Sequence, residues 1–160
     1  MGEREKSLRD GIRRLEAIGR VMSVSSFYET EPVEIADQAW FLNCAVRLET
    51  SLSPEQLMAG LLGTEQEMGR QRLQKKGPRV IDFDILLFGD AVIDMPDLII
   101  PHPAMQGRRF VLEPMAEIAP EVQHPILKKA MRELLDALPL GQVVRRVKNS
   151  SRIHTDSRVD

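Results

Sequence analysis

The chain has 160 residues, of which 42% are hydrophobic and 29% charged, and its net charge is −2. This length suits one domain that buries about two-thirds of the surface it exposes when unfolded, so its core needs no disulfide or structural metal. The composition excludes a collagen-like chain, a coiled-coil rod and disorder over most of the length. Because proteins that coat nucleic acid are usually basic, the balanced charge argues against nucleic acid as a partner.

The sequence shows no sign of export or of membrane insertion. Its single cysteine, Cys44, cannot form an intrachain disulfide, and the first residues contain no signal-peptide hydrophobic region. No apolar run approaches the ~20 residues that a membrane span needs. We therefore expect a cytoplasmic protein without membrane contacts, in which Cys44 is a buried small hydrophobic residue and not a nucleophile.

The first elements follow from hydrophobic periodicity. Apolar residues at spacings of three and four predict a helix over residues 5–18. Residues 21–28 are rich in β-branched and aromatic residues and predict a strand. After a polar loop, residues 41–50 alternate in polarity and predict another strand, on which Phe41 and Asn43 share a face.

A second helix has a well-marked start. Ser53 can cap it, Pro54 suits the first helical position, and Gln56 completes a capping box. We expect this helix to end at Gly69. The stretch over residues 70–79 lacks periodicity and predicts a loop.

The remaining elements alternate between strands and helices. An apolar strand is predicted over residues 80–88 and a short return strand over 91–93, followed by a proline-rich passage. Helical patterns return at 110–118 and 127–138, whereas 148–160 is polar and is expected to be a disordered tail. The hairpin signals favour an antiparallel α+β layer over a doubly wound sheet.

Asp82 and Asp84 are the first candidates for chemistry. They lie two residues apart on the predicted strand, so they project from the same face within an apolar run. Two carboxylates about 7 Å apart repel each other, and burying them unpaired costs several kcal/mol each. A divalent cation would balance them, because Mg²⁺ usually takes one or two carboxylates together with phosphate oxygens.

The loop before that strand is strongly basic. It holds no acidic residue and five basic ones, namely Arg70, Arg72, Lys75, Lys76 and Arg79. Guanidinium groups can grip phosphate oxygens with two bonds. A basic loop alone is more often solvated surface, but beside an acidic pair it favours a metal-phosphate site of the kind used in phosphoryl transfer.

Two downstream features fit such a site without requiring it. His102 lies between Pro101 and Pro103, where it either holds a phosphate oxygen or is a structural loop histidine. Arg108 and Arg109 open a helical segment, where cations oppose the macrodipole. They therefore either gain from an anion held nearby or lie in solvent.

These residues together resemble a known family, 6-hydroxymethyl-7,8-dihydropterin pyrophosphokinase of folate biosynthesis. Its signature is matched by Lys75-Lys76-Gly77-Pro78-Arg79-Val80-Ile81-Asp82-Phe83-Asp84-Ile85-Leu86, with Phe83 where an aliphatic residue is usual. Further motifs follow in the family's order at residues 26–33, 41–43, 69–72 and 101–103. The resemblance runs from about Gly2 to about Pro125.

The resemblance implies a fold and a reaction. The fold is ferredoxin-like α+β, an antiparallel sheet with helices packed on it. The reaction moves the β,γ-pyrophosphoryl group of ATP onto the hydroxymethyl oxygen of the dihydropterin and releases AMP. A Mg²⁺-dependent transferase of this kind acts on small molecules, and we expect it to be a monomer.

The resemblance also assigns roles to residues. Two Mg²⁺ ions would be held by Asp82 and Asp84, and the catalytic set would be Arg70, Arg79, Asp82 and Asp84. ATP would be bound by Glu65, Arg70, Arg72, Lys76, Arg79, Ile85, Ile99, His102 and Arg108. The pterin would be bound by Thr30, Glu31, Pro32, Val33, Phe41, Asn43 and Phe110. Phe41 and Phe110 would form an aromatic sandwich around the flat heterocycle, although outside this family they would more often be core residues.

Departures from the family pattern set further expectations. Lys76 stands where many members carry a tryptophan, and Asp97 stands where some carry a nucleotide-contacting arginine. Only Met1-Gly2-Glu3 matches the family's opening, which is normally an apolar strand ending in Gly-Ser-Asn. We therefore expect a pyrophosphokinase domain over residues 1–147 that lacks the family's first strand, followed by the tail at 148–160.

Two alternatives remain open at this point. The first is a non-catalytic relative that binds phosphate or pterin and has lost its first strand. The second, from the Asp-x-Asp pair alone, is a metal-dependent nucleotide-sugar transferase. Such enzymes are generally larger, and the pair here follows a Gly-Pro-Arg loop, so this second alternative is disfavoured.

Overall fold

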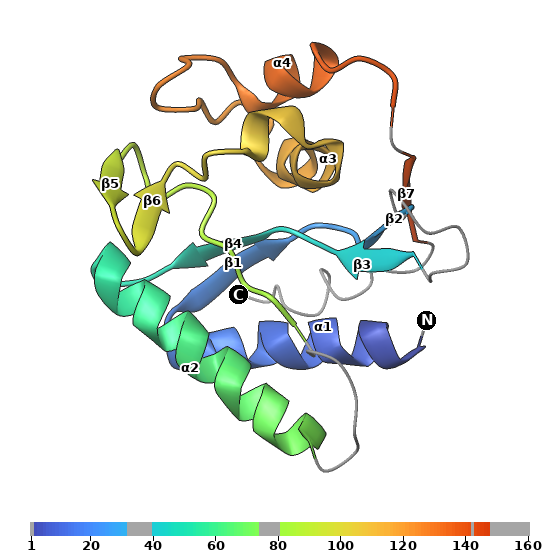
Figure 1. Ribbon diagram of the computed structural model, residues 1–160. Coiled ribbons are helices and arrows are strands. Elements are labelled where there is room, and N and C mark those ends of the chain that lie inside the picture. Colours follow the sequence, from blue (N-terminus) through green and yellow to red (C-terminus); the bar gives the residue numbers. More distant parts are fainter. Residues whose placement is uncertain (1, 32–39, 74–80, 142, 148–160) are drawn as a thin grey trace.

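The computed structural model describes residues 2–31, 40–73, 81–141 and 143–147. The strands within residues 20–49 and 144–146 lie between two layers of helices (Figure 1). On one side are α1 (Gly2–Arg14) and α2 (Pro54–Leu73), and on the other are α3 (Arg109–Ile118) and α4 (Met131–Asp136). Every strand pairing among the described residues is antiparallel. The predicted α+β class with helices packed on antiparallel sheets is therefore confirmed.

The first helical layer follows its sequence signals closely. α1 spans Gly2–Arg14 and continues as a 3-10 turn, η1, over Leu15–Ala17. α2 spans Pro54–Leu73. Its predicted capping box is present, since the Gln56 N–H donates to Ser53 Oγ at 3.1 Å and the Ser53 N–H donates to Gln56 Oε1 at 2.9 Å.

The predicted end of this helix at Gly69 is wrong. α2 continues past Gly69 to Leu73, so the predicted loop begins as helix. A glycine inside a helix costs only about 1 kcal/mol relative to alanine, which the surrounding helix formers can offset.

The two long predicted strands each divide into two short ones. β1 (Arg20–Val24) pairs with β4 (Val46–Glu49), and β2 (Tyr28–Thr30) pairs with β3 (Phe41–Asn43). The break lies at Ser25 and Ala45. The Ser25 N–H donates to Ala45 O, but the Ala45 N–H donates to the Ser25 hydroxyl oxygen, both at 2.9 Å. A side chain thus replaces one main-chain bond of the ladder.

The second helical layer covers the other side. η2 (Met105–Gly107) leads into α3 (Arg109–Ile118), and α4 (Met131–Asp136) packs on α3. After α4, β7 (Val144–Arg146) returns to pair with the free side of β2. The chain therefore forms two apolar clusters, one between the sheets and α1–α2 and the other centred on α3 and α4.

The strand predicted over residues 80–88 is wrong in its described part. Residues 81–88 form no strand ladder within the part of the chain that the structure describes. They border a cavity of about 560 Å³, and β4 lines the cavity as well. A strand needs a paired neighbour, and this segment has none among the described residues.

The proline-rich passage contains a β-hairpin that the sequence analysis did not predict. β5 (Ile93–Met95) pairs with β6 (Leu98–Ile100) across a turn that holds Pro96 and Asp97. Only the first of these strands was expected, and its predicted position was two residues early. Proline at the turn removes a donor that the ladder does not need.

Cys44 is less buried than expected, but its chemistry fits the expectation that it is not a nucleophile. It is half-buried against the first apolar cluster, and burial raises the pKa of its thiol to about 12. A thiol with so high a pKa is not a nucleophile near neutral pH.

Candidate active site

The acidic pair lies on an extended segment with alternating exposure. Asp82 and Asp84 are exposed, whereas Ile81 and Phe83 are half-buried and Ile85 is buried. The prediction that the two carboxylates share a face is confirmed. The prediction that they are buried is wrong, because the alternation turns only their neighbours inward. Because both residues are exposed, the cost of burying two unpaired carboxylates does not arise.

Glu65 fastens this segment to α2. Its Oε2 accepts a hydrogen bond from the Phe83 N–H, midway between the two aspartates. No group of three or more metal-ligating side chains occurs in residues 2–31, 40–73, 81–141 and 143–147. Two carboxylates on one face supply oxygen ligands of the kind that hard divalent cations prefer.

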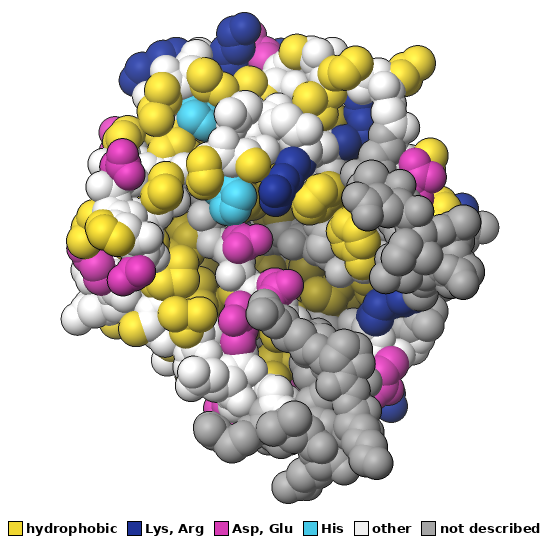
Figure 2. Space-filling view, viewed as in Figure 1, with side chains coloured by type: hydrophobic (Ala, Val, Ile, Leu, Met, Phe, Trp, Pro, Cys, Tyr) yellow, Lys and Arg dark blue, Asp and Glu magenta, His cyan; other side chains and the backbone are white. Residues whose placement is uncertain are grey.

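His102 is tied to the same segment. Its main-chain N–H donates to Leu86 O at 2.9 Å, and its ring Nδ1 accepts from the Ala104 N–H at 3.2 Å. With Nδ1 accepting, the neutral ring carries its proton on Nε2, where it can donate to an oxyanion. In the space-filling view, acidic side chains gather near the middle of one face, beside a histidine and a basic side chain (Figure 2).

An aromatic pair lies at the junction of β3 and α3. The Phe41 and Phe110 rings meet edge to face, with centroids 5.5 Å apart and planes at 86°. The Arg108 guanidinium lies 5.6 Å from the centroid of the Phe110 ring. The structure thus brings together Phe41 and Phe110, which were expected to bind the pterin, and Arg108, which was expected to bind ATP. A flat ligand can enter between the phenyl rings only if they separate, since an edge-to-face contact leaves no parallel gap.

Two unpartnered polar atoms lie beside these rings. Thr30 Oγ1 and Asn43 Oδ1 are buried and have no hydrogen-bond partner among the described residues. The Asn43 amide nitrogen is used, since it donates to Phe110 O at 2.7 Å. In the β2–β3 ladder Thr30 is opposite Phe41, and Asn43 is opposite Tyr28, so all four project from one face.

Buried polar groups without partners are rare, and each costs about 1–3 kcal/mol. Two of them on one face, next to an exposed aromatic ring, indicate a site for a ligand that is flat and has a polar edge. We call this arrangement of Thr30, Phe41, Asn43 and Phe110 the ring slot.

Glu31 is bonded to Val143, just before β7. Its carboxylate accepts from the Val143 N–H at 2.9 Å, and its own N–H donates to Val143 O at 3.1 Å. It therefore fastens the end of β2 to the C-terminal strand. Pro32 and Val33, also predicted to bind substrate, lie outside the described residues.

The remaining predicted residues are scattered. Arg70 and Arg72 belong to the last part of α2, and Lys76 and Arg79 lie outside the described residues. The other three lie at different depths: Ile85 is 8% exposed in the first apolar cluster, Ile99 is 46% exposed on β6, and Arg108 is exposed. Asp97, which departs from the family pattern, is exposed as well.

Sequence reasoning missed one acid near the ring slot. Glu117 on α3 accepts a hydrogen bond from the Tyr28 hydroxyl at 2.7 Å. Burial and this bond raise the pKa of Tyr28 to about 12. The only signal for Glu117 in the sequence is an acid within an apolar helical stretch, which does not reveal its partner.

The chain is similar to known proteins over most of its length. Residues 1–120 match the family described as 7,8-dihydro-6-hydroxymethylpterin-pyrophosphokinase. None of the helices in the described part of the chain has the length and apolarity to span a bilayer.

Three relatives show how far the similarity extends. The 2-amino-4-hydroxy-6-hydroxymethyldihydropteridine pyrophosphokinase of Bacillus subtilis is 47% identical over 125 residues, which are 77% of this chain and 75% of that protein. The protein of the same name from Pseudomonas aeruginosa is 42% identical over 126 residues, 79% of this chain and 77% of that protein. The "Folic acid synthesis protein fol1" of Schizosaccharomyces pombe is 44% identical over 128 residues, 80% of this chain but only 17% of that protein.

Proposed function

Because this chain belongs to the 7,8-dihydro-6-hydroxymethylpterin-pyrophosphokinase family, we propose that it transfers pyrophosphate from ATP to 6-hydroxymethyl-7,8-dihydropterin in folate biosynthesis. The family expected from the sequence is confirmed. The observation that carries the proposal is the ring slot, where two aromatic rings adjoin two unpartnered polar atoms. Arg108 lies over one of these rings and so joins the slot to a phosphate path.

The reaction balances without a redox partner. The hydroxymethyl oxygen of the pterin attacks the β-phosphorus of ATP and forms a new P–O bond. The bond from the β-phosphorus to the oxygen that bridges it to the α-phosphorus breaks, and AMP leaves with that oxygen. The hydroxyl proton passes to water.

Asp82 and Asp84 would hold two Mg²⁺ ions together with oxygens of the triphosphate. Two exposed carboxylates that project from one face fit this hard cation, which retains water ligands readily. When bound, the ions neutralise charge on the triphosphate and make its phosphorus a better electrophile.

The side chains around the pair position the phosphates. The His102 Nε2–H donates to a phosphate oxygen, because its Nδ1 is occupied by the Ala104 N–H. Arg108 neutralises charge where the phosphates meet the ring slot. Arg70, Arg72, Lys76 and Arg79 complete the phosphate path, and Glu65 and Ile99 contact the nucleotide while Ile85 supports the segment from the core.

The ring slot orients the pterin. Its bicyclic ring lies between Phe41 and Phe110, which separate to admit it. The carbonyl oxygen of Asn43 accepts from an N–H of the heterocycle, and the Thr30 hydroxyl bonds to the same polar edge. Both buried atoms, which have no partner among the described residues, gain one in the complex, and this favours binding.

A cavity adjoins β4 and residues 81–88. A ferredoxin-like sheet would be complete with one more strand between β4 and residues 81–88, where the cavity of about 560 Å³ lies. We place one catalytic domain at residues 1–147, acting as a cytoplasmic monomer on small molecules, and a polar tail at 148–160.

The experiment is a product assay with purified protein, ATP, Mg²⁺ and the dihydropterin, separated by ion-exchange chromatography. We expect AMP and the pterin diphosphate in equal amounts. Formation of ADP would contradict the proposed transfer. Pterin binding without any AMP would instead favour the non-catalytic relative, which the similarity to named pyrophosphokinases does not favour.

A further inference from the structure

Glu117 makes an unusual number of contacts for one carboxylate. It lies near the C-terminal end of α3, and its side chain is 22% exposed. Its Oε1 accepts from the Tyr28 hydroxyl at 2.7 Å, and its Oε2 accepts from the Ser26 hydroxyl at 2.9 Å. Both oxygens also accept from the Ser26 N–H, at 3.0 and 3.2 Å. Arg146 on β7 lies 3.7 Å from Oε1.

These contacts join the two sides of the ring slot. Glu117 shares α3 with Phe110, which forms one wall. Its donor Ser26 precedes β2, and its donor Tyr28 is the first residue of β2. Thr30 lies two residues further along β2, on the same face as Tyr28. The Glu117 carboxylate therefore links α3, which carries Phe110, to β2, which carries Thr30.

We propose that Glu117 is a positioning residue that sets the separation between α3 and the β2–β3 ladder, and thereby the width of the ring slot. This inference rests on the proposed binding of the pterin in that slot. Glu117 acts through Phe110 and Thr30 and does not contact the substrate itself.

The hydrogen bonds around Glu117 explain why a carboxylate is needed at this position. Two oxygens receive bonds from the Ser26 N–H and from two hydroxyls, and charge-assisted bonds of this kind are short and directional. A glutamine keeps one acceptor oxygen but presents an NH₂ group to the remaining donors. An alanine leaves the Ser26 N–H and the Tyr28 hydroxyl without their acceptor, so α3 can shift relative to the ladder.

The test separates positioning from general stability. We expect Glu117→Ala to raise KM for the dihydropterin by on the order of tenfold, with kcat and KM for ATP within about twofold of their original values. Glu117→Gln should recover part of the loss, to about threefold. Tyr28→Phe, which removes one donor and keeps the ring, should raise the same KM by about two- to threefold. The dissociation constant of the pterin, measured by its fluorescence, should follow its KM.

The matched control is Glu121→Ala. Glu121 pairs with Arg132 on the surface, at 2.8 Å, and makes none of the contacts described above. Its loss should leave both KM values unchanged. If the Glu117 variants lower kcat at constant KM for the pterin, or change nothing, the positioning role is wrong.

Two further variants distinguish a wrong role for Glu117 from a wrong location of the pterin site. Phe41→Ala and Asn43→Ala should weaken pterin binding if the ring slot is the pterin site. If they do so and the Glu117 variants do not, Glu117 is only structural. If none of these variants affects pterin binding, the site itself is misplaced. Should Glu117→Ala fail to fold, Glu117→Gln and Tyr28→Phe decide by the same KM comparison.

Discussion

Glu65 accepts a hydrogen bond from the main-chain N–H of Phe83, and this bond holds the acidic segment on α2. The acceptor lies on a helix, and the donor lies between Asp82 and Asp84, on a segment that has no strand partner among the described residues. The position of the two carboxylates therefore depends on a side chain 18 residues earlier in the chain.

The Glu65 bond can be tested by amide hydrogen exchange. In Glu65→Ala the Phe83 N–H loses its acceptor, so we expect its exchange rate to rise by at least about tenfold and the protein to lose about 1–2 kcal/mol of stability. Glu65→Gln retains an acceptor oxygen and should keep most of the protection. Equal exchange of the Phe83 amide in all three proteins would contradict the bond.

The acidic pair should matter for activity and hardly at all for folding. Asp82→Asn and Asp84→Asn each remove a charged oxygen ligand, so we expect kcat to fall by at least about 100-fold. Both side chains are exposed, so the free energy of unfolding should change by less than about 0.5 kcal/mol. Urea denaturation checks this, and a loss of several kcal/mol would show that the pair is structural.

Removing the Thr30 hydroxyl should affect the stability of the free protein and its binding of pterin in opposite directions. Its hydroxyl oxygen is buried without a partner in the described part of the chain, so the isosteric Thr30→Val should leave the free protein equally stable or stabilise it by about 1 kcal/mol. The same change should weaken pterin binding, because the ligand loses a hydrogen bond. Thr30→Ser keeps the hydroxyl and should bind nearly normally. A Thr30→Val protein that is less stable but binds pterin as before would contradict this assignment.

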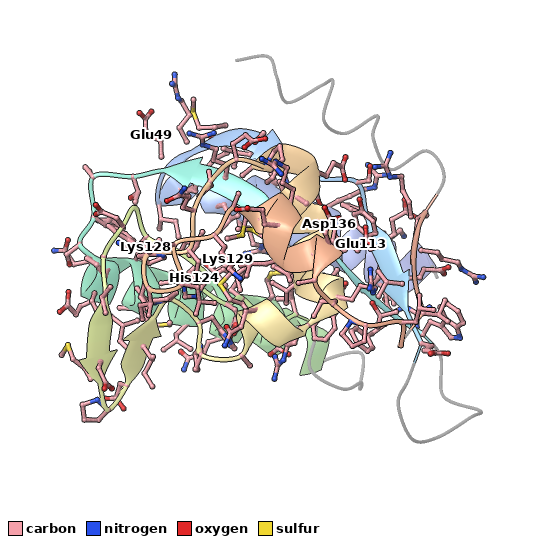
Figure 3. All side chains as sticks on the ribbon, turned by 90° about the horizontal axis from the view of Figure 1, so that it is seen from above. Glu49, Glu113, His124, Lys128, Lys129 and Asp136 are labelled. Carbon is pink, nitrogen blue, oxygen red and sulfur yellow. The ribbon has the colours of Figure 1, made fainter. Side chains whose placement is uncertain are left out.

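His124 makes stability depend on pH. It lies in the turn with Lys128 and Lys129 beside α4 (Figure 3). It is 3% exposed, and its Nδ1 accepts from the Ile126 and Leu127 N–H groups at 3.2 and 3.1 Å. Burial lowers the pKa of its ring below the usual 6.5.

The sign of this effect follows from linkage. Since the folded pKa is the lower one, the unfolded chain binds more protons, and stability is lost as the pH falls below about 6.5 toward the folded pKa. In His124→Asn the side-chain oxygen can accept the same two N–H groups and does not titrate. We therefore expect a smaller fall in the melting temperature between pH 7 and 5 for His124→Asn than for the original protein. An identical fall in both would show that His124 does not cause it.

Much of the site could be predicted because its signals are local. The alternation around Asp82 and Asp84, and that around Phe41 and Asn43, places each pair on one face without knowledge of the fold. The capping box at Ser53 is equally local. The order of the family's motifs then predicted that distant residues such as Phe41 and Phe110 belong to one site.

What could not be predicted depends on contacts between distant residues. Glu117 meets Ser26 across 91 positions, and nothing in either neighbourhood announces the bond. The segment at 81–88 has the composition of a strand, but pairing requires a neighbour that its own residues do not specify. α2 passes Gly69 because the whole helix outweighs one unfavourable residue.

The most direct test of the proposed transfer is a ³¹P NMR spectrum of the complete reaction with ATP, Mg²⁺ and the dihydropterin. We expect the signals of ATP to be replaced by one AMP resonance and by two coupled resonances of a pterin diphosphate, in equal amounts, and no such change with Asp84→Asn. ADP together with a pterin monophosphate would contradict transfer of the pyrophosphoryl group as a unit.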